Sequence, residues 1–168
     1  QAEHLQGERT GVFITLGDPA VYSTFMYTLP YIEKTGVAVE VVPGVTSFCA
    51  VADTMMMPLV AWDEDLVIAP VRKNSSEDLG EILRSHDNIV LMKPSSNKKA
   101  LLQAIRENHL EEHFVLVTKS GTGEERLVTD ITELEQYDIP YLSTVIIKRQ
   151  VKMTPGSNAA ACRNDLKM

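Results

Sequence analysis

The stretch from Gly11 to Asp18 reads GVFITLGD and is followed by Pro19. Its apolar residues form a run that is long enough for a buried strand and too short for a helix. The run ends at Gly17, where the backbone can turn freely or approach another molecule closely. Asp18 then offers a carboxylate, and Pro19 presets the first turn of the next element. A strand, a Gly-Asp turn and a helix are typical of the ligand-binding edge of an open α/β sheet, although an ordinary strand-to-helix turn has the same pattern.

The residues after this turn continue the alternation of helix and strand. Val21 to Lys34 carries apolar residues at helical spacing, which predicts a helix. Val37 to Val42 reads VAVEVV and predicts a second strand that is covered on both faces. Pro43-Gly44 ends this strand, and a short helix is expected over Phe48 to Asp53.

A second strand-helix pattern starts at Asp65 and predicts a separate α/β domain with a mainly parallel sheet. Its predicted strands are Leu66 to Ala69, Asn88 to Met92, Phe114 to Lys119 and Tyr141 to Lys148, with a shorter one within Glu124 to Val128. One predicted helix is capped by Ser75 or Ser76 and ends at about Arg84, and another is capped by Asn97 and ends at about Asn108. The domains are therefore expected to be residues 1–60 and residues 61–150, with residues 151–168 as a mobile tail.

Composition limits the partners that this chain can have. Its 168 residues, 44% of them apolar, suffice for a sizeable core in one or two domains. The formal charge of -7 argues against unaided binding to a nucleic acid, but it allows a polyanionic small molecule held by a few local cations. Cys49, Cys162 and the four histidines form no metal-ligand pattern, and no apolar run has membrane-spanning length. We therefore expect a cytoplasmic protein with reduced thiols, no metal, and neither a nucleic acid nor a membrane as its partner.

Two motifs taken together resemble the tetrapyrrole methylase family. They are GDPAVYSTFMYTL at residues 17–29 and VPGVTSFCAVAD at residues 42–53. Further matches follow in the same order: MMMPL at 55–59, VLMK at 90–93, SGTGEER at 120–126 and STVII at 143–147. Within the family, the YST after GDP and the TSFCA after PG are most similar to the branch that methylates C(20) of precorrin-2 or cobalt-precorrin-2.

At its start, this sequence departs from the family's pattern. Family members open with a strand and a GxGPGD-type glycine loop, which this sequence lacks. The resemblance therefore implies a C-terminal portion of such a protein. It consists of two α/β domains of the tetrapyrrole methylase type, of which the first, residues 1–60, is incomplete.

The resemblance implies transfer of a methyl group from S-adenosyl-L-methionine to a reduced tetrapyrrole in cobalamin biosynthesis, which leaves S-adenosyl-L-homocysteine. Because the sulfonium already makes the methyl electrophilic, the protein's contribution is positioning, and no catalytic residue is assigned. Relatives are homodimers, so a homodimer is implied here as well. Two alternatives stay open. One is another branch of the superfamily, such as a different precorrin methylase, diphthine synthase or a ribosomal-RNA 2′-O-methyltransferase. The other is a non-catalytic α/β module.

The resemblance also assigns residues to a donor site and to a substrate cleft. The donor-binding residues are Gly17, Asp18, Val21, Thr46, Ser47, Met92, Thr144 and Val145; the cleft residues are Tyr22, Ser120 and Gly121 with Thr122. Each has a structural alternative. A helix N-cap explains Asp18 and the Thr-Ser pair, buried packing explains Tyr22 and the strand residues, and a plain hairpin loop explains residues 120–122. Arg72 and Lys73 follow a strand end and are weaker candidates for substrate carboxylates.

Overall fold

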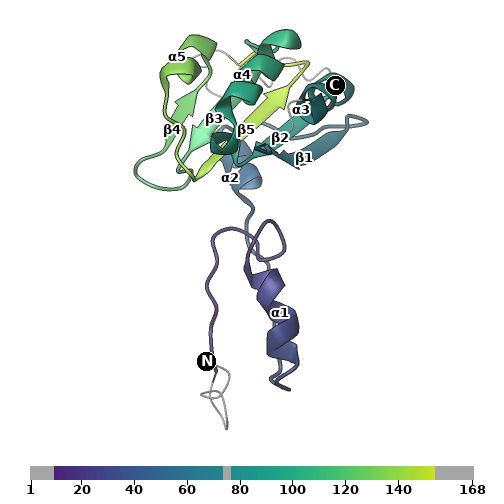
Figure 1. The fold of residues 1–168 in the computed structure, drawn as a ribbon, viewed down its shortest axis with the longest axis vertical. Helices are drawn as coiled ribbons and strands as arrows, with labels where there is room; N and C mark the ends of the chain where they lie inside the picture. The colour runs from purple at the N-terminus through teal and green to yellow at the C-terminus, as the bar shows by residue number, and fades with distance from the viewer. Residues whose placement is uncertain (1–9, 74–76, 154–168) are drawn as a thin grey trace. The chain divides into compact units, whose positions relative to one another are not determined.

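The computed structural model describes residues 10–73 and 77–153 (Figure 1). Its helices are α1 (Phe25–Glu33), α2 (Ser47–Thr54), α3 (Glu77–Ser85), α4 (Lys98–Glu107), α5 (Ile131–Gln136) and the short 3-10 helix η2 (Pro94–Ser96); its strands are β1 (Leu66–Pro70), β2 (Asn88–Met92), β3 (Phe114–Thr118), β4 (Arg126–Val128) and β5 (Ser143–Lys148). The expected caps Ser75 and Ser76, Cys162 and most of the expected tail lie outside the described residues.

By its internal contacts the chain divides into two units, Gln1–Ser47 and Phe48–Met168. The first unit ends before the boundary near residue 60 that the sequence indicates, because the residues from Phe48 onward make their contacts mainly within the second unit.

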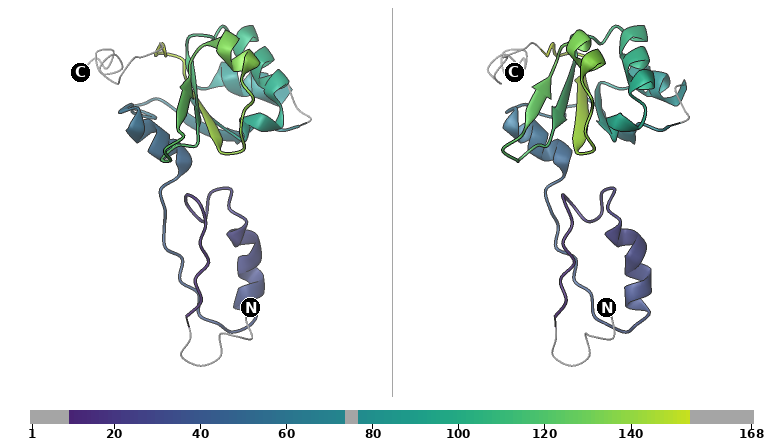
Figure 2. Two further views of the ribbon diagram at one scale, coloured as in Figure 1. Left: turned by 90° about the vertical axis from the view of Figure 1, so that its left-hand side faces the viewer. Right: turned by 60° about the vertical axis from the view of Figure 1, so that its left-hand side comes forward.

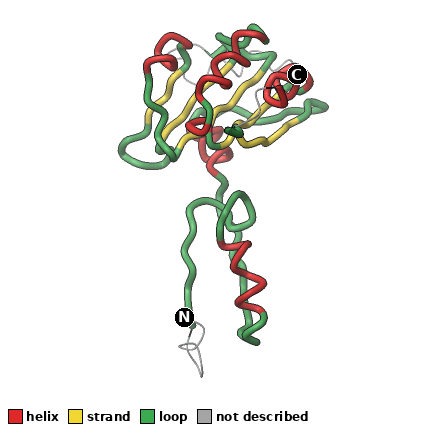
Figure 3. Tube along the Cα trace, in the orientation of Figure 1, coloured by secondary structure: helices red, strands yellow, loops and turns green. Residues whose placement is uncertain are grey.

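In the first unit, the two expected strands do not form. Gly11 to Leu16 and Val37 to Val42 have no strand structure, and Figure 3 shows them as loop. The prediction of strands there is wrong for this structure, and the reason is physical. A strand exists through hydrogen bonds to a neighbouring strand, and neither stretch has such a partner among the described residues. Their side chains favour a strand, but no neighbouring strand among the described residues supplies the backbone hydrogen bonds that a strand needs.

Helix α1 begins four residues later than its sequence pattern indicates, at Phe25 rather than at Val21. The cause is the turn at Asp18, whose carbonyl accepts a hydrogen bond from the N–H of Val21 at 3.2 Å. The Oγ of Ser23 then accepts from the N–H of Phe25 at 3.2 Å, where the helix starts. The residues between the turn and the helix are therefore a loop.

The described part of the second unit holds a five-stranded sheet in the order β1-β2-β5-β3-β4. Only β1 and β2 pair in parallel; β5 is antiparallel to both of its neighbours, and β4 is antiparallel to β3. The expectation of a mainly parallel sheet is therefore wrong. The β-α-β-α-β order does give β1, β2 and β3 a common direction, but β5 inserts between β2 and β3 and converts both contacts to antiparallel ones.

The sheet separates two sets of buried side chains, because successive residues of a strand point to opposite faces. One set forms a core with α3 and α4, which lie together on one side of the sheet, whereas α2 lies on the other (Figure 2). The strand residues of this helix-side core include Ile89, Leu91, Phe114, Leu116, Val145 and Ile147. The alternate residues Val90, Val115 and Ile146 are also buried and lie outside this cluster, so both faces are covered.

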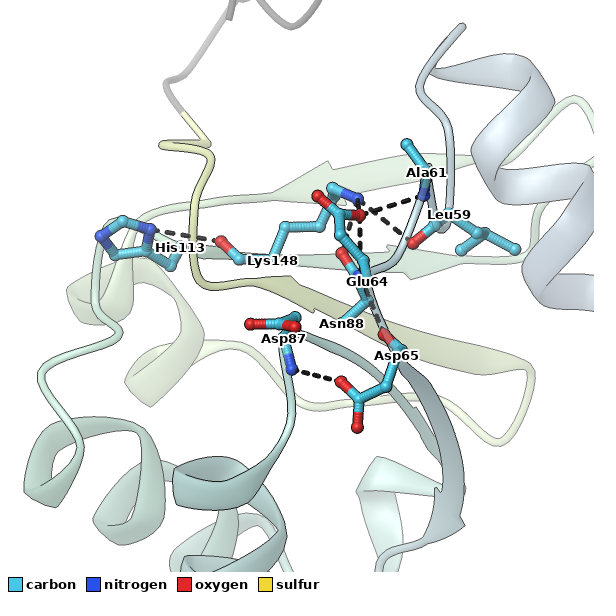
Figure 4. Close-up of polar contacts among 8 residues, drawn as sticks. All are labelled: Leu59, Ala61, Glu64, Asp65, Asp87, Asn88, His113 and Lys148. Carbon is cyan, nitrogen blue, oxygen red and sulfur yellow. Dashed lines mark hydrogen bonds and ion pairs between the residues drawn. The ribbon is translucent and has the colours of Figure 1, made fainter. Parts of the chain in front are cut away.

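A buried lysine joins β5 to the connector that follows α2 (Figure 4). The side chain of Lys148 is 4% exposed. Its Nζ donates to Oδ1 of Asn88 at 2.6 Å and to the carbonyl of Leu59 at 3.2 Å, and it lies 3.6 Å from Oε2 of Glu64. Burial alone would raise the pKa of Glu64, but hydrogen bonds from Asn88 and from the N–H of Ala61, together with the charge of Lys148, hold that pKa below its usual value. The connector is thereby fixed to the ends of two interior strands, β2 and β5.

Candidate functional site

The carboxylate of Asp18 joins the two glycine turns that the sequence singles out. Its Oδ1 accepts a hydrogen bond from the N–H of Ala20 at 2.8 Å, within its own turn. Its Oδ2 accepts from the N–H of Gly44 at 3.0 Å, in the Pro-Gly turn. Asp18 is therefore no helix cap, since α1 starts only at Phe25. It holds two turns together that are far apart in the sequence.

The backbones of the two turns touch at their glycines. A Cβ atom on Gly44 would lie 2.3 Å from the carbonyl oxygen of Gly17, a distance that no real Cβ contact tolerates. Gly17 itself has a φ of +73°, in the left-handed region that favours glycine. Gly44 is not among the site residues that the resemblance implies. Its Pro-Gly dipeptide signalled only a turn, because nothing local shows that a carbonyl from a distant turn will lie against it.

Thr46 lies two residues beyond Gly44 and directly before α2. Its Oγ1 is buried and has no hydrogen-bond partner in the described structure. The expected alternative, a capping hydroxyl, is therefore not what the Thr46 side chain does. A buried hydroxyl without a partner carries an energetic cost that a polar ligand would remove. Ser47, the neighbouring candidate, is exposed and begins the helix.

Val21 and Tyr22 follow the Asp18 turn. Val21 closes that turn through its N–H and is half-buried. Tyr22 has a left-handed φ of 51° and an exposed side chain, and it precedes α1. It therefore lies in a loop and not, as the structural alternative supposed, on the first turn of a helix.

The strand candidates are brought together in the second unit. Met92, at the end of β2, is the register partner of Thr144 on β5, so their side chains share the sheet face opposite α3 and α4. The carbonyl of Met92 accepts from the N–H of Val71 at 2.8 Å, so one polar group of its backbone is already used within the fold. Val145 points into the helix-side core and is fully buried, which leaves no side-chain surface for a ligand.

Residues 120–122 lie in the hairpin loop between β3 and β4, as their structural alternative proposed. The loop is closed by its own hydrogen bonds: the N–H of Thr122 donates to the carbonyl of Lys119 at 3.1 Å, and the N–H of Gly121 donates to Oε2 of Glu125 at 3.0 Å. Ser120 differs from its neighbours, because its Oγ is buried without a hydrogen-bond partner in the described structure. The loop needs no ligand to hold its shape.

Three further observations concern residues outside these motifs. Arg72 is exposed and lies 3.7 Å from the carboxylate of Asp78, so its charge is shared with an exposed acid. Within residues 10–73 and 77–153, no group of His, Cys, Asp and Glu side chains is arranged to hold a metal ion. None of the helices described there is long and apolar enough to cross a membrane.

The comparison with protein families agrees with the motifs. The model of the Tetrapyrrole (Corrin/Porphyrin) Methylases matches residues 1–135. A probable cobalt-precorrin-2 C(20)-methyltransferase of Methanocaldococcus jannaschii is 36% identical over 140 residues, which are 81% of this chain and 57% of that protein. The cobalt-precorrin-2 C(20)-methyltransferase of Salmonella typhimurium is 30% identical over 152 residues, which are 89% of this chain and 62% of that protein. The chain belongs to the tetrapyrrole methylase family, and it spans about three-fifths of the length of these relatives.

Solved structures show the same fold. A cobalt precorrin-4 methyltransferase, CbiF, superposes with a TM-score of 0.66 at 23% identity, over 79% of this chain and 61% of its own. A uroporphyrin-III C-methyltransferase of Thermus thermophilus, solved with S-adenosyl homocysteine, superposes with a TM-score of 0.59 at 21% identity, over 79% of this chain and 63% of its own. The α/β fold of the tetrapyrrole methylase type is thus confirmed.

Proposed function

We propose that this chain provides part of an S-adenosyl-L-methionine-dependent C-methyltransferase that acts on a tetrapyrrole of cobalamin biosynthesis. Membership of the tetrapyrrole methylase family supports the reaction class. The curated relatives from M. jannaschii and S. typhimurium are named for C(20) of cobalt-precorrin-2, which supports C(20) of precorrin-2 or its cobalt complex as the acceptor.

The observation that carries this proposal is the pair of turns joined by Asp18. Gly17 and Gly44 leave bare backbone where the turns meet, and the unpartnered hydroxyl of Thr46 lies two residues away. Bare backbone and an unused hydroxyl fit a ligand that carries an amino acid and a nucleoside, since both parts are recognised by hydrogen bonds at short range.

In the proposed mechanism, this chain contributes by positioning the methyl donor relative to the acceptor carbon. When bound, S-adenosyl-L-methionine would supply an electrophilic methyl group to the acceptor carbon and leave as S-adenosyl-L-homocysteine, and the proton lost from that carbon would pass to water. Both oxygens of Asp18 are engaged by backbone N–H groups, so we assign it to positioning the turns and not to proton transfer. The hydroxyl of Thr46 is assigned to binding the donor. Correct orientation of this kind is worth a large part of a methyl-transfer barrier.

Calorimetric titration with S-adenosyl-L-homocysteine tests the donor site. We expect this chain or the complete M. jannaschii relative to bind it. In the chain that binds, Asp18→Asn, which places an amide group against the N–H of Gly44, should weaken binding about tenfold, the effect of losing one charge-assisted hydrogen bond. Glu40→Gln, an exposed acid of the same unit, is the control and should leave binding unchanged. Binding by neither protein would leave only the non-catalytic module.

The acceptor is tested separately with precorrin-2 as substrate. Nuclear magnetic resonance of the product should locate the new methyl at C(20). A methyl group at another carbon would assign the protein to a different precorrin methylase branch. A cytoplasmic location stays a prediction from the composition and the cysteines, and a homodimer stays a prediction from the resemblance.

A further inference from the structure

Strand β1 forms one edge of the five-stranded sheet (Figure 1). Among the described residues, β2 is its only strand neighbour, and the two strands pair in parallel. The strand at the other edge, β4, has three residues and begins with Arg126, whereas β1 has five residues and none of them is charged. Short edge strands and charged edge strands resist pairing with another chain, and β1 has neither of these protections.

The backbone of β1 offers hydrogen-bonding groups on the side that faces away from β2. The N–H of Val71, directly after the strand, donates to the carbonyl of Met92 on β2 at 2.8 Å. Successive residues of a strand direct their backbone groups to opposite sides, so the odd-numbered residues of β1 also face β2. Leu66 and Ile68 therefore direct their N–H and C=O groups outward. Pro70 does so as well, but it offers only a carbonyl.

The two ends of β1 carry opposite charges. Asp63, Glu64 and Asp65 precede the strand, and Arg72 and Lys73 follow it after one apolar residue. All of these side chains except that of Glu64 are exposed. Two copies of β1 in a parallel pair would place acid against acid and base against base, which is unfavourable. In an antiparallel pair, each acidic end would instead meet the basic end of the other copy.

We propose that the β1 edges of two copies of this chain pair in antiparallel fashion about a twofold axis at Ile68, which joins their two sheets into one. Ile68 then lies opposite Ile68 of the second copy, and the two residues exchange both of their hydrogen bonds. Leu66 lies opposite Pro70 of the second copy. The N–H of Leu66 donates to that carbonyl, so Pro70 needs no N–H of its own.

This register also matches the side chains. Ile68 is 37% exposed, and its counterpart in the second copy would cover it. On the face that carries α3 and α4, Val67 lies opposite Ala69 of the second copy. Ala69 borders a hollow of about 260 Å³, whose other lining residues are Pro70, Arg72, Asp78, Leu79 and Ile82. The half-buried Val67 of each copy thus gains an apolar surface to pack against.

The size and charge of this contact determine how the dimer should behave. One pair of five-residue strands buries little surface, and interfaces below about 1,200 Å² are typically transient. We therefore expect sedimentation velocity to show a dimer that forms as the concentration of the chain is raised. Because the charged ends are exposed, raising the salt concentration should weaken the dimer.

Hydrogen exchange followed residue by residue tests the pairing itself. Between a dilute and a concentrated sample, the amides of Leu66 and Ile68 should exchange about tenfold more slowly, because a paired amide exchanges only on opening. The amides of Val67 and Ala69 face β2 and should exchange at the same rate in both samples.

Charge-exchange variants locate the contact. Lys73→Asp, and independently Asp63→Lys, should weaken the dimer about tenfold, because each places like charges at the ends of the paired strands. The double variant with both changes exchanges the ends of each pair and should restore the dimer. Lys99→Asp is the control: it alters the net charge as Lys73→Asp does, but Lys99 is an exposed residue on α4. It should leave the dimer unchanged.

Three results would each overturn the proposal. They are a chain that stays monomeric at every concentration, a dimer in which the amides of Leu66 and Ile68 exchange as fast as in the monomer, or a double variant that dimerises no better than Lys73→Asp alone. A dimer formed through any other surface gives the second result. No methyl donor is present in these measurements, so their outcome is independent of the titration with S-adenosyl-L-homocysteine.

Discussion

Asp18 and Gly44 show how a single side chain can define the geometry of a turn pair. The carboxylate supplies two acceptors at the distance of two backbone N–H groups, and a glycine opposite it lets the second turn come into contact. Neither residue needs to touch a ligand for its replacement to change binding, since Asp18 holds the N–H of Gly44 and Thr46 lies two residues beyond Gly44.

Gly44→Ala should disrupt this turn pair. The new Cβ would lie 2.3 Å from the carbonyl oxygen of Gly17, a backbone atom that can move only with its turn. Faster hydrogen exchange at residues 17–21 and loss of S-adenosyl-L-homocysteine binding are the expected readouts. Gly123→Ala is the matched control, because a Cβ at Gly123 meets nothing within 4 Å. Equal exchange in the two variants would contradict the close approach of the turns.

For single residues, the sequence predicted the turns and caps that residue types favour, but it did not predict contacts between residues far apart in the chain. The Gly-Asp and Pro-Gly turns were both predicted from their residues, and so was the cap of α4, where Oδ1 of Asn97 accepts from the N–H of Ala100 at 3.1 Å. The bond between Asp18 and Gly44 was not predictable, because it joins residues whose spacing follows no helical or strand period. Side-chain orientation was also out of reach: Val145 and Thr144 are adjacent, yet only the completed sheet shows which of them faces the helices.

Among the elements, β5 determines the second unit. Its six residues are all buried, and it pairs with both β2 and β3. The pattern of Tyr141 to Lys148 predicted a strong strand, but a strand's place in a sheet depends on which edges the earlier strands leave open. The sequence therefore predicted the elements from β1 to β3 well, but it did not predict that most strand pairs are antiparallel.

Lys148, at the end of β5, buries an ammonium group whose partners lie outside its own strand. Lys148→Met should destabilise the second unit by about 1–3 kcal/mol, because it leaves the buried Oδ1 of Asn88 and the carbonyl of Leu59 without their donor. Urea unfolding followed by far-UV circular dichroism measures this loss. The control is Lys152→Met, whose ion pair with Glu112 is exposed to solvent, so its removal should leave the stability almost unchanged. A loss no larger than that of the control would show that the lysine is replaceable by an apolar side chain.

For the whole molecule, the two units differed in how far their sequences predicted them. The second unit contains the partners of its own strands, so local patterns were enough to place α2, α3, α4 and the five strands closely, whereas α5 and η2 were not predicted. The patterns at Gly11 to Leu16 and Val37 to Val42 are equally apolar, but in the described structure they find no partner. Sequence preference predicts a strand only where the rest of the fold supplies its neighbour.

The free energy of unfolding of the second unit should decrease in acid, where its carboxylates become protonated. Hydrogen bonds lower the pKa of three carboxyl groups. The N–H of Asp87 donates to Asp65, the hydroxyl of Thr132 donates to Asp130, and the ammonium of Lys119 donates to Glu124. The pKa of Glu64 is lowered by the hydrogen bonds and the charge described above. A carboxyl whose pKa is lower in the folded state stabilises it fully above the unfolded value of about 4, and this contribution is lost as the pH falls through the folded value.

The free energy of unfolding in urea should therefore be level from about pH 7 to pH 5 and decrease below about pH 4. Glu64→Gln removes one titrating group from the Lys148 network and should make this decrease smaller, whereas Glu81→Gln, an exposed residue on α3, should reproduce the profile of the unaltered chain. If Glu64→Gln lowered stability at pH 7 and left the slope below pH 4 unchanged, the carboxylate would act only as a hydrogen-bond acceptor. The acid sensitivity would then have to come from the exposed ion pairs. Because salt screens exposed ion pairs, repeating the titration at high ionic strength separates their contribution from that of the Glu64 network.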